Sequence, residues 1–229
     1  MQAITDTKHL TVQTLPPILV LTGEDVGQFE WLKKDILKKI GYDPSDLNYS
    51  YFDMKEASYA EVELDLVSLP FFADEKIVIL DHLLDLTTAK KRNLTDEDLK
   101  QFENYLENPS ESTRLVIFAE GKLDSKRRLV KLLKRDAQII EATTPKEQDL
   151  KRYFASQAQE LGLHFVGDSL DQLLLKSGYD FGELQKNIAL LQAYKEDGQI
   201  TLQDIEEVVP KSLQDNIFDL TQKIGRAHV

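Results

Sequence analysis

The fold of this chain is decided by the stretch Pro17-Ile18-Leu19-Val20-Leu21-Thr22-Gly23-Glu24-Asp25, close to its start. The continuous apolar run in it is typical of a β-strand that is buried on both faces. The run ends at a glycine, and a helix is predicted directly afterwards over 26–40, with Phe29, Leu32 and Ile36 at helical spacing. A buried strand that leads into a helix in this way favours a parallel sheet with helices packed against it.

Strand-like and helix-like segments alternate outward from this stretch as far as about residue 141. Further strands are predicted at 47–53, 76–80, 115–118 and 138–140, and further helices at 59–69, from Thr95 and after Asp124, which can cap its helix. Val62, Leu66 and Leu69 form the apolar stripe of the 59–69 helix, and 84–93 is expected to be a mobile loop with a small basic cluster. The alternation predicts an α/β fold with a three-layer parallel sheet and crossover helices over 1–143.

The chain changes character at about residue 146, beyond which only helices are predicted. Their expected ranges are 146–161, 169–177 and 181–194, followed by a short last helix that Thr201 can cap. These segments predict a small all-α domain over 144–211, with 212–229 beyond it.

The composition is that of an ordinary globular protein, with 41% hydrophobic and 30% charged residues among 229. The chain has no cysteine, which rules out disulfides and thiolate metal sites and fits a reducing compartment. No apolar run is long enough to span a membrane and no secretion signal is visible, so a cytoplasmic protein without a membrane partner is expected. The net charge of −12 repels nucleic acid, so any DNA contact is expected to be local or supplied by partners.

The turn after the first strand is the place where an α/β protein could hold a nucleotide phosphate. A phosphate loop needs a second glycine five positions after the first, followed by Lys and then by Ser or Thr. After Gly23, this chain has Gln28, Phe29 and Glu30 at those positions, and two acidic residues directly follow the glycine. The sequence therefore predicts that this turn does not bind ATP.

No other catalytic constellation is visible in the sequence. The four histidines are scattered along the chain, at His9, His82, His164 and His228. The chain has neither the Gly-x-Ser-x-Gly elbow of a serine nucleophile nor the His-Glu-x-x-His motif of a zinc protease. We therefore predict no catalytic residue, no metal ligand and no cofactor.

The segment Leu69-Pro70-Phe71-Phe72-Ala73-Asp74 places two adjacent phenylalanines between a proline and the third strand. Because proline presets a turn and disfavours helix at the residue before it, two neighbouring rings here are hard to bury on one face of a regular element. Two interpretations are open. The rings pack under the sheet as core residues, or they form an exposed anchor for a pocket on another protein.

A run of basic residues lies on or beside the helix after Asp124. It consists of Lys122, Lys126, Arg127, Arg128, Lys131, Lys134 and Arg135. One interpretation is a solvated face opposite the apolar stripe of that helix. The other is a contact with DNA phosphates or with a neighbouring subunit, for which the first five residues are the candidates. The negative net charge predicts that DNA binding by the chain alone is weak and salt-sensitive.

Several blocks of the chain, taken in order, match a known family. They are Leu21-Thr22-Gly23-Glu24, Ser68-Leu69-Pro70-Phe71-Phe72-Ala73-Asp74-Glu75-Lys76, Leu106-Glu107-Asn108-Pro109, Gly121-Lys122-Leu123-Asp124, Leu161-Gly162-Leu163 and Asp215-Asn216-Ile217-Phe218-Asp219-Leu220. On these blocks the chain resembles the delta subunit of the bacterial DNA polymerase III clamp loader over nearly its whole length.

The resemblance implies an AAA+-like α/β domain that has lost ATP binding, followed by a small helical lid. It implies a subunit of a DNA-directed DNA polymerase, a nucleotidyltransferase, that is not an enzyme on its own. The implied role is to bind and open the ring-shaped sliding clamp during DNA replication, with Leu69, Phe71 and Phe72 as the clamp-binding residues. The implied partners are the clamp (the beta subunit), the gamma/tau and delta prime subunits of the loader, and DNA through the assembled complex.

The chain differs from the family in one respect, and two other functional classes of protein remain open. Family members continue into a third helical domain, the collar, so 212–229 is expected to begin a linker to a collar that this chain lacks, and 225–229 fits the family pattern poorly. The first competing class is a non-catalytic AAA+-like interaction adaptor outside replication, which a clamp pull-down would separate. The second is an active ATPase of the same fold, which would need the Lys and Thr that are missing after Gly27.

Overall fold

The computed structural model describes residues 1–70, 73–195 and 197–210. They fall into two compact units, one formed by Gln2–Thr144 and one that begins at Pro145. The expected linker at 212–229 lies outside the described residues. Within the described ranges, no helix is both long enough and apolar enough to cross a lipid bilayer.

The first unit is built on a five-stranded parallel sheet in the order β2-β3-β4-β1-β5. The strands are β1 (Ile18–Gly23), β2 (Tyr49–Asp53), β3 (Lys76–Asp81), β4 (Thr113–Glu120) and β5 (Gln138–Ala142). β1 lies between β4 and β5, with Val20 beside Ile117 on one side and Ile139 on the other. Every residue of β1 and of β3 is buried, as expected for strands that are covered on both faces.

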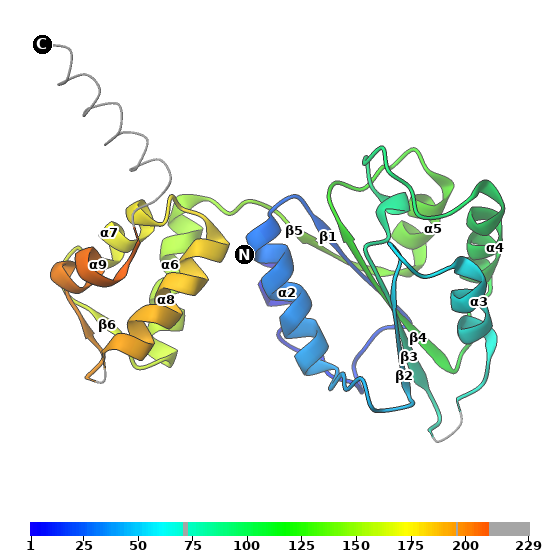
Figure 1. The fold of residues 1–229 in the computed structure, drawn as a ribbon, viewed down its shortest axis with the longest axis horizontal. Helices are drawn as coiled ribbons and strands as arrows, with labels where there is room; N and C mark the ends of the chain where they lie inside the picture. Colours follow the sequence, from blue (N-terminus) through cyan, green and yellow to red (C-terminus); the bar gives the residue numbers. More distant parts are fainter. Residues whose placement is uncertain (71–72, 196, 211–229) are drawn as a thin grey trace, which may run out of the picture. The chain divides into compact units, whose positions relative to one another are not determined.

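Helices cover both faces of this sheet (Figure 1). They are α1 (Gln2–Thr7), α2 (Val26–Lys39), α3 (Tyr59–Val67), α4 (Asp96–Glu107) and α5 (Arg128–Asp136), together with the short 3-10 helix η1 (Leu84–Leu86). α3, α4 and α5 share one apolar core with strand residues such as Val20, Val78 and Ile117. α2 lies on the other face, where Lys33 stands 5.6 Å from the ring centre of Phe118. The three layers confirm the α/β fold class expected from the sequence.

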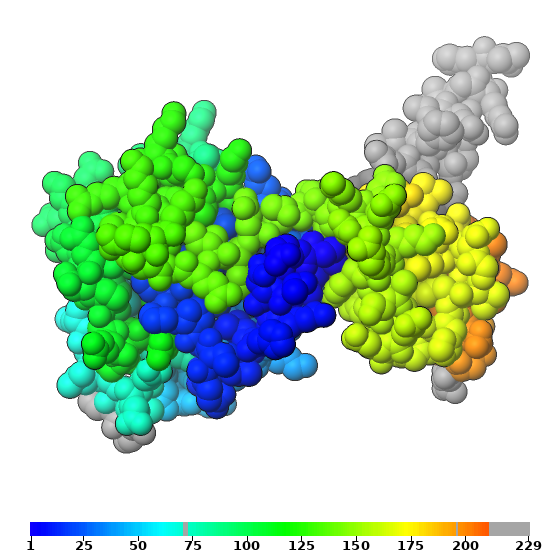
Figure 2. Space-filling view, turned by 180° about the vertical axis from the view of Figure 1, so that it is seen from behind, coloured from blue at the N-terminus to red at the C-terminus, as the bar shows by residue number. Residues whose placement is uncertain are grey.

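The helix α1 has no counterpart in the sequence-based expectations, because it has six residues and a mostly polar sequence. It packs on α2 and β5, and the N-terminal segment forms part of the outer surface of the first unit (dark blue in Figure 2). Ala3 and Ile4 are buried in this contact, and Lys39 donates from α2 to the backbone carbonyl of Thr7 at 2.8 Å. The N-terminal helix is thereby fixed to the layer that α2 forms.

The helix α3 is shorter than the predicted range 59–69. It ends at Val67, and Ser68 already has an extended backbone with ψ 151°. The helix could not have continued to residue 69 in any case, because Pro70 disfavours helical backbone at Leu69, the residue before it. Leu69 therefore does not belong to the apolar stripe of the helix, as we expected, but lies beyond it with 74% of its surface exposed.

Asp124 does not cap α5, contrary to the expectation. The residue before the helix is Arg127, and the helix begins at Arg128. The Asp124 carboxylate instead accepts hydrogen bonds from the backbone amide of Lys126 at 3.1 Å and from the side chain of Arg127 at 3.2 Å. It thus stabilises the turn that precedes the helix. At α4, by contrast, the helix begins after Thr95 as predicted, and Thr95 forms a capping box with Asp98.

The second unit is a small group of helices: α6 (Glu147–Glu160), α7 (Ser169–Lys176), α8 (Phe181–Tyr194) and α9 (Leu202–Val208). Its centre contains the fully buried rings of Phe154 and Phe181, whose centres are 5.4 Å apart. Thr201 caps α9 through a capping box with Asp204, as the sequence predicted. Two strands of two residues each, β6 (His164–Phe165) and β7 (Gln199–Ile200), add a parallel pair that is too short to leave a sequence pattern.

Candidate functional site

Large apolar side chains are exposed at the end of α3. Leu64 is 71% exposed and Val67 is 60% exposed, and Leu69, just beyond the helix, is 74% exposed. Val62 and Leu66 of the same helix are fully buried. The helix therefore has one apolar face in the core and a second apolar edge in solvent, and such an exposed edge is typical of a contact surface for another protein.

A buried lysine holds this end of α3 against the sheet. Lys76, the first residue of β3, is 5% exposed. Its ammonium group donates to Ser68 Oγ at 2.6 Å, to Asp65 Oδ1 at 3.0 Å and to the backbone carbonyl of Asp65. Thr113 of β4 adds a hydrogen bond from its hydroxyl to the carbonyl of Leu66 at 3.2 Å. These donors satisfy carbonyl groups that the last turn of a helix leaves without partners.

The far end of the same segment is held by an ion pair. Arg114 of β4 donates from Nε to Glu75 at 2.9 Å and also from its terminal nitrogen, so that the carboxylate is bound at both oxygens. The hydrogen bond from Arg114 lowers the pKa of Glu75 below its ordinary value, although partial burial opposes this. The residues that flank 69–74 in the sequence, Ser68 and Glu75, are therefore both fixed to neighbouring strands.

Of the three residues that the resemblance assigns to clamp binding, the structure describes one. Leu69 is at the surface, as described above. Phe71 and Phe72 lie outside the described residues. Their role as an anchor therefore stays a prediction.

The turn after β1, where a nucleotide phosphate would bind, is closed by the chain itself. The backbone amide of Gly23 donates to the carbonyl of Gly121 at 3.0 Å, and that of Asp25 donates to the carbonyl of Ala142 at 3.3 Å. Asp25 also caps α2 by accepting from the amide of Gln28 at 2.8 Å. Amides that are bonded within the protein in this way are not free to bind phosphate oxygens.

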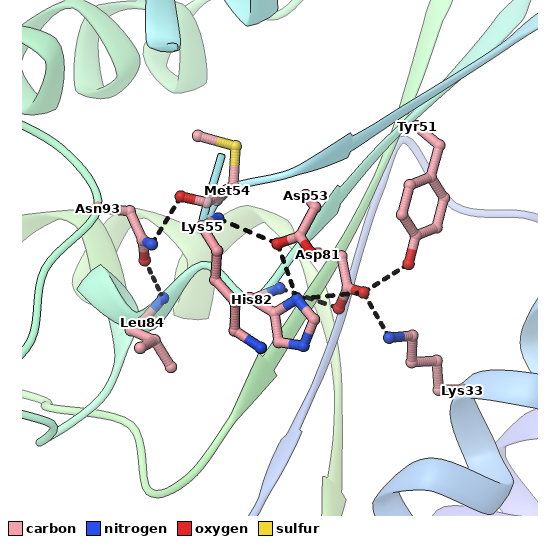
Figure 3. A network of polar contacts seen from close by, with 9 residues as sticks. All are labelled: Lys33, Tyr51, Asp53, Met54, Lys55, Asp81, His82, Leu84 and Asn93. Carbon is pink, nitrogen blue, oxygen red and sulfur yellow. Dashed lines mark hydrogen bonds and ion pairs between the residues drawn. The ribbon is translucent and has the colours of Figure 1, made fainter. Parts of the chain in front are cut away.

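The acidic residue at the end of β3 is neutralised by a lysine from α2 (Figure 3). The Asp81 carboxylate accepts from the ammonium group of Lys33, from the hydroxyl of Tyr51 and from the backbone amide of His82. The side chains of Lys33 and Asp81 are 14% and 5% exposed. Burial, followed by the hydrogen bond to Asp81, raises the pKa of Tyr51, so its phenol stays protonated and donates. This carboxylate thus has its positive partner inside the protein.

His82 links the ends of β2 and β3. It has a positive φ of 57°, and its Nδ1 lies 2.9 Å from Asp53 Oδ1 and 3.4 Å from Asp81 Oδ2. Burial by itself would raise the pKa of Asp53, but hydrogen bonds from the Lys55 backbone and from His82 lower it. The imidazole is therefore placed between two carboxylates at the edge of the sheet (Figure 3).

The loop at 84–93, expected to be mobile, is tied to the same edge. Asn93 accepts a hydrogen bond from the Leu84 amide at 2.9 Å and donates to the Met54 carbonyl at 2.7 Å (Figure 3). Within the part of the chain that the structure describes, no group of three or more His, Asp or Glu side chains is placed to hold a metal ion. The arrangement is thus a structural network that fixes the loop.

The basic residues predicted to contact DNA or a subunit fall into two groups, according to whether they have partners within the fold. Arg127 donates to the backbone carbonyl of Asp85 as well as to Asp124, and Arg128 pairs with Glu103 and Glu107 of α4. These two arginines are used within the fold. The remaining candidates are exposed and, in the described ranges, have no acidic side chain at ion-pair distance: Lys122, Lys126 and Lys131.

A family model described as "DNA polymerase III, delta subunit" matches residues 19–143, which is more than half of the chain. The chain belongs to the DNA polymerase III delta subunit family. The match covers β1 to β5, so it includes the closed turn at Gly23 and the segment between Ser68 and Glu75. The predicted resemblance to the clamp loader delta subunit is thereby confirmed.

Two relatives in this family come from Bacillus subtilis. The DNA polymerase III subunit delta of strain 168 is 28% identical over 223 residues, which cover 95% of this chain and 63% of that protein. The solved structure of the Bacillus subtilis DNA clamp loader delta protein has a TM-score of 0.71 at 24% identity, and the match covers 97% of this chain and 66% of that one. At this identity the structural match shows the fold. The chain spans less than two thirds of the length of either relative.

Two residues of the candidate site were missed by the sequence analysis. Lys76 is the first residue of a strand, and Lys33 is one of two adjacent lysines in a helix, so both look like ordinary solvated cations. Their burial depends on acceptors that lie 11 and 48 positions away in the chain. No local pattern could have identified them.

Proposed function

We propose that this chain binds a ring-shaped sliding clamp and opens one of its interfaces during DNA replication, as a clamp-loader subunit that does not hydrolyse ATP. One observation carries the proposal. In a member of the delta subunit family, Leu69 is 74% exposed directly after a helix end that Lys76 fixes to the sheet. The segment that Leu69 begins continues into Phe71 and Phe72.

The proposed contact is made by large apolar side chains that directly follow a helix end held in place by Lys76. Burying one such side chain in a pocket is worth roughly 1.5–3 kcal/mol. Because the hydrogen bonds of Lys76 already hold the helix end, less ordering entropy is lost on binding. Leu64 and Val67 on α3 would extend the apolar contact beyond the segment itself.

Opening of the ring would follow from differential affinity. A protein shifts a two-state equilibrium only by binding one state more tightly than the other. If the apolar segment and α3 fit a clamp with one open interface better than a closed clamp, binding favours the open ring without nucleotide. The closed turn at Gly23 and the pairing of Asp81 with Lys33 support a subunit that leaves the ATP hydrolysis to its partners.

The proposed partners follow the same reasoning. They are the clamp, the gamma/tau and delta prime subunits of the loader, and DNA in the assembled complex. We propose the cytoplasm as the compartment, where replication takes place in bacteria. The chain by itself is proposed to have no enzymatic activity.

The clamp contact is tested with Phe71→Ala combined with Phe72→Ala, and separately with Leu69→Ala. Affinity for the purified clamp is measured by surface plasmon resonance, and stability is measured by thermal melting of the same samples. Loss of a central contact residue typically costs about 2 kcal/mol or more, which is roughly a 30-fold loss of affinity. Leu175→Ala, at a 61% exposed leucine of α7, is the matched control and should bind normally.

Two results would contradict the anchor. If the rings belong to the core, each substitution costs about 3–5 kcal/mol of stability and the double variant melts far lower than the parent protein. If the double variant melts and binds normally, the clamp contact lies elsewhere. Unchanged melting with lost binding is the result that supports the proposal.

The absence of an ATP site is tested by isothermal calorimetry with ATP and Mg²⁺. We expect no binding heat, because the backbone amides of Gly23, Asp25 and Gln28 are bonded within the protein. A micromolar affinity for ATP would contradict this assignment.

A further inference from the structure

The strand β2 forms one edge of the five-stranded sheet. Each of its residues is half-buried, and Leu47, two positions before the strand, is 74% exposed. The opposite edge is different, because α1 packs on β5. A sheet edge that no helix or loop covers presents backbone groups with which a strand of another chain can pair.

The hydrogen bonds to β3 determine which backbone groups of β2 point outward. The carbonyl of Asn48 accepts from the amide of Ile77 at 2.9 Å, and the amide of Met54 donates to the carbonyl of Asp81 at 2.9 Å. Alternate residues of a strand bond to the same neighbouring strand. The even-numbered residues of 48–54 therefore face β3, and the odd-numbered residues face away from it.

Four of the outward groups have no hydrogen-bond partner among the described residues. The amide of Tyr49 is already bonded to the carbonyl of Asp46 at 3.0 Å. The carbonyl of Asp53 accepts from the amide of Glu56 at 3.0 Å. The groups that remain are the carbonyl of Tyr49, the amide and carbonyl of Tyr51, and the amide of Asp53. They alternate between acceptor and donor along the edge, which is the pattern that an added strand uses.

The aromatic side chains beside this edge are already fixed in place. The hydroxyl of Tyr49 donates to the carbonyl of Ile40, and that of Tyr51 donates to Asp81 (Figure 3). Tyr42 lies against both rings, with ring centres 5.8 and 5.5 Å from its own. Side chains of an added strand would pack on these rings. Because the rings are ordered beforehand, less entropy is lost on binding.

The surroundings of the edge are acidic. The stretch 42–57 contains four carboxylates and one cation, Lys55. One of the carboxylates is paired with a histidine. The other three, Asp43, Asp46 and Glu56, have no cation at ion-pair distance within the described ranges. A segment with lysine or arginine near its ends would complement these charges.

A second copy of the chain fits this edge less well. Two copies could pair in antiparallel fashion about Tyr51, which is the residue of β2 with both its amide and its carbonyl free. Asp46 and Glu56 lie equally far from Tyr51 in the sequence, so Asp46 of one copy would come opposite Glu56 of the other. Like charges opposite each other destabilise a strand pair.

We propose that the free edge of β2 binds an extended, basic segment of another protein as a further strand of the sheet. The backbone of Tyr51 and its two neighbours on the edge supplies the main-chain hydrogen bonds. The carboxylates around the edge supply the preference for a basic segment. The proposal goes beyond the clamp contact and does not depend on it.

The test is an NMR hydrogen-exchange titration of the isotope-labelled full chain. The probe is a short peptide with lysine at both ends and alternating valine and threonine between them, which favours a strand. In the free protein, the amides of Tyr51 and Asp53 should exchange much faster than those of Ser50 and Phe52, which are bonded to β3. With the peptide at about ten times its Kd, exchange of the two edge amides should slow about tenfold.

Two altered peptides separate strand pairing from other kinds of binding. Proline in place of the middle residues removes backbone donors, and glutamate in place of the lysines reverses the charge. Neither peptide should protect the amides of Tyr51 and Asp53. The proposal is overturned if either of them protects these amides like the lysine peptide, or if the lysine peptide gives no protection.

The charge complementarity is tested with Asp46→Asn combined with Glu56→Gln, which keeps the side-chain shapes. Loss of two partly screened ion pairs should weaken binding of the lysine peptide about threefold or more. Glu97→Gln with Glu111→Gln, at two exposed carboxylates of the first unit, is the matched control and should bind normally. Thermal melting confirms that both variants are folded.

Equal affinity of the edge variant and the control variant would overturn the assignment of a basic partner. Sedimentation of the chain alone tests the second copy. A dimer that the lysine peptide dissociates would also overturn the proposal, because the edge would then be used between two copies. A monomer whose edge amides are protected only by the lysine peptide is the result that supports it.

Discussion

The ammonium group of Lys76 and the carboxylate of Asp65 lie 3.0 Å apart. This ion pair joins the end of α3, which directly precedes Leu69 and its neighbours, to the start of β3. Asp65 is in the last turn of α3, and Lys76 is the first residue of β3. Lysine is rarely buried unless it is paired, and a cation near a helix C-terminus is favoured by the helix dipole. The pair therefore connects the stability of this helix end to the position of the exposed apolar side chains.

Lys76→Met removes the charge and the donors but keeps a side chain of similar length. We expect a loss of about 1–3 kcal/mol in urea unfolding, because the Asp65 and Ser68 acceptors lose their partner. Clamp affinity should fall as well, because the helix end before Leu69 is then no longer held and must be ordered on binding. Lys34→Met, at an exposed lysine of α2, is the control. An unchanged unfolding midpoint would show that the Lys76 bonds do not hold the helix end.

Lys33→Met should be strongly destabilising, because it leaves the buried Asp81 carboxylate without its positive partner. Breaking a buried pair from one side typically costs about 3–5 kcal/mol. Adding Asp81→Asn should restore part of the loss, because the double variant contains no unpaired charge at this place. A double-mutant cycle by urea unfolding measures the coupling. Additive effects of the two substitutions would mean that the two side chains do not interact.

Gly23→Ala should destabilise the protein by more than about 2 kcal/mol, because it combines backbone strain with a clash. Gly23 has a φ of +131°, and a Cβ there would lie 2.1 Å from the carbonyl oxygen of Ala142. Gly162→Ala is the matched control, because Gly162 has a φ of +74° but no atom within 4 Å of the added Cβ. Thermal melting of both variants separates strain from clash. Equal losses would show that β1 can move away from β5.

The ion pair between Glu75 and Arg114 should make a small, pH-dependent contribution to stability. The pKa of Glu75 is lower in the folded protein than in the unfolded chain, so the pair stabilises the fold above the ordinary carboxyl pKa. This contribution is lost as the pH falls through the lowered pKa. Glu75→Gln should therefore cost roughly 0.2–1 kcal/mol at pH 7, because a partly exposed pair is screened by water. The difference in melting temperature between the two proteins should shrink below about pH 4, and a difference that grows on acidification would contradict this assignment.

The strand at 18–23 and the missing phosphate loop were readable from the sequence alone. A strand buried on both faces must be apolar at every position, so its run of side chains is visible without knowing its neighbours. A phosphate loop needs particular residues at neighbouring positions, so Gln28, Phe29 and Glu30 suffice to show that it is absent. Local signals of this kind also predicted a helix from Thr95 and the cap that Thr201 forms on α9.

The sequence by itself therefore determined features that depend on neighbouring residues: the α/β order of elements, the cap at Thr201 and the missing phosphate-binding motif after β1. The tertiary structure decided which charges are paired. Lys33 meets Asp81 across 48 positions, and the backbone amide of Thr88 bonds to the carbonyl of Lys122 in a contact between two loops. It also decided that Leu69 faces solvent, because the end of α3 depends on Pro70 and on the buried Lys76. The energy of a charge or an apolar side chain depends on what surrounds it in space, and folding alone brings those surroundings together.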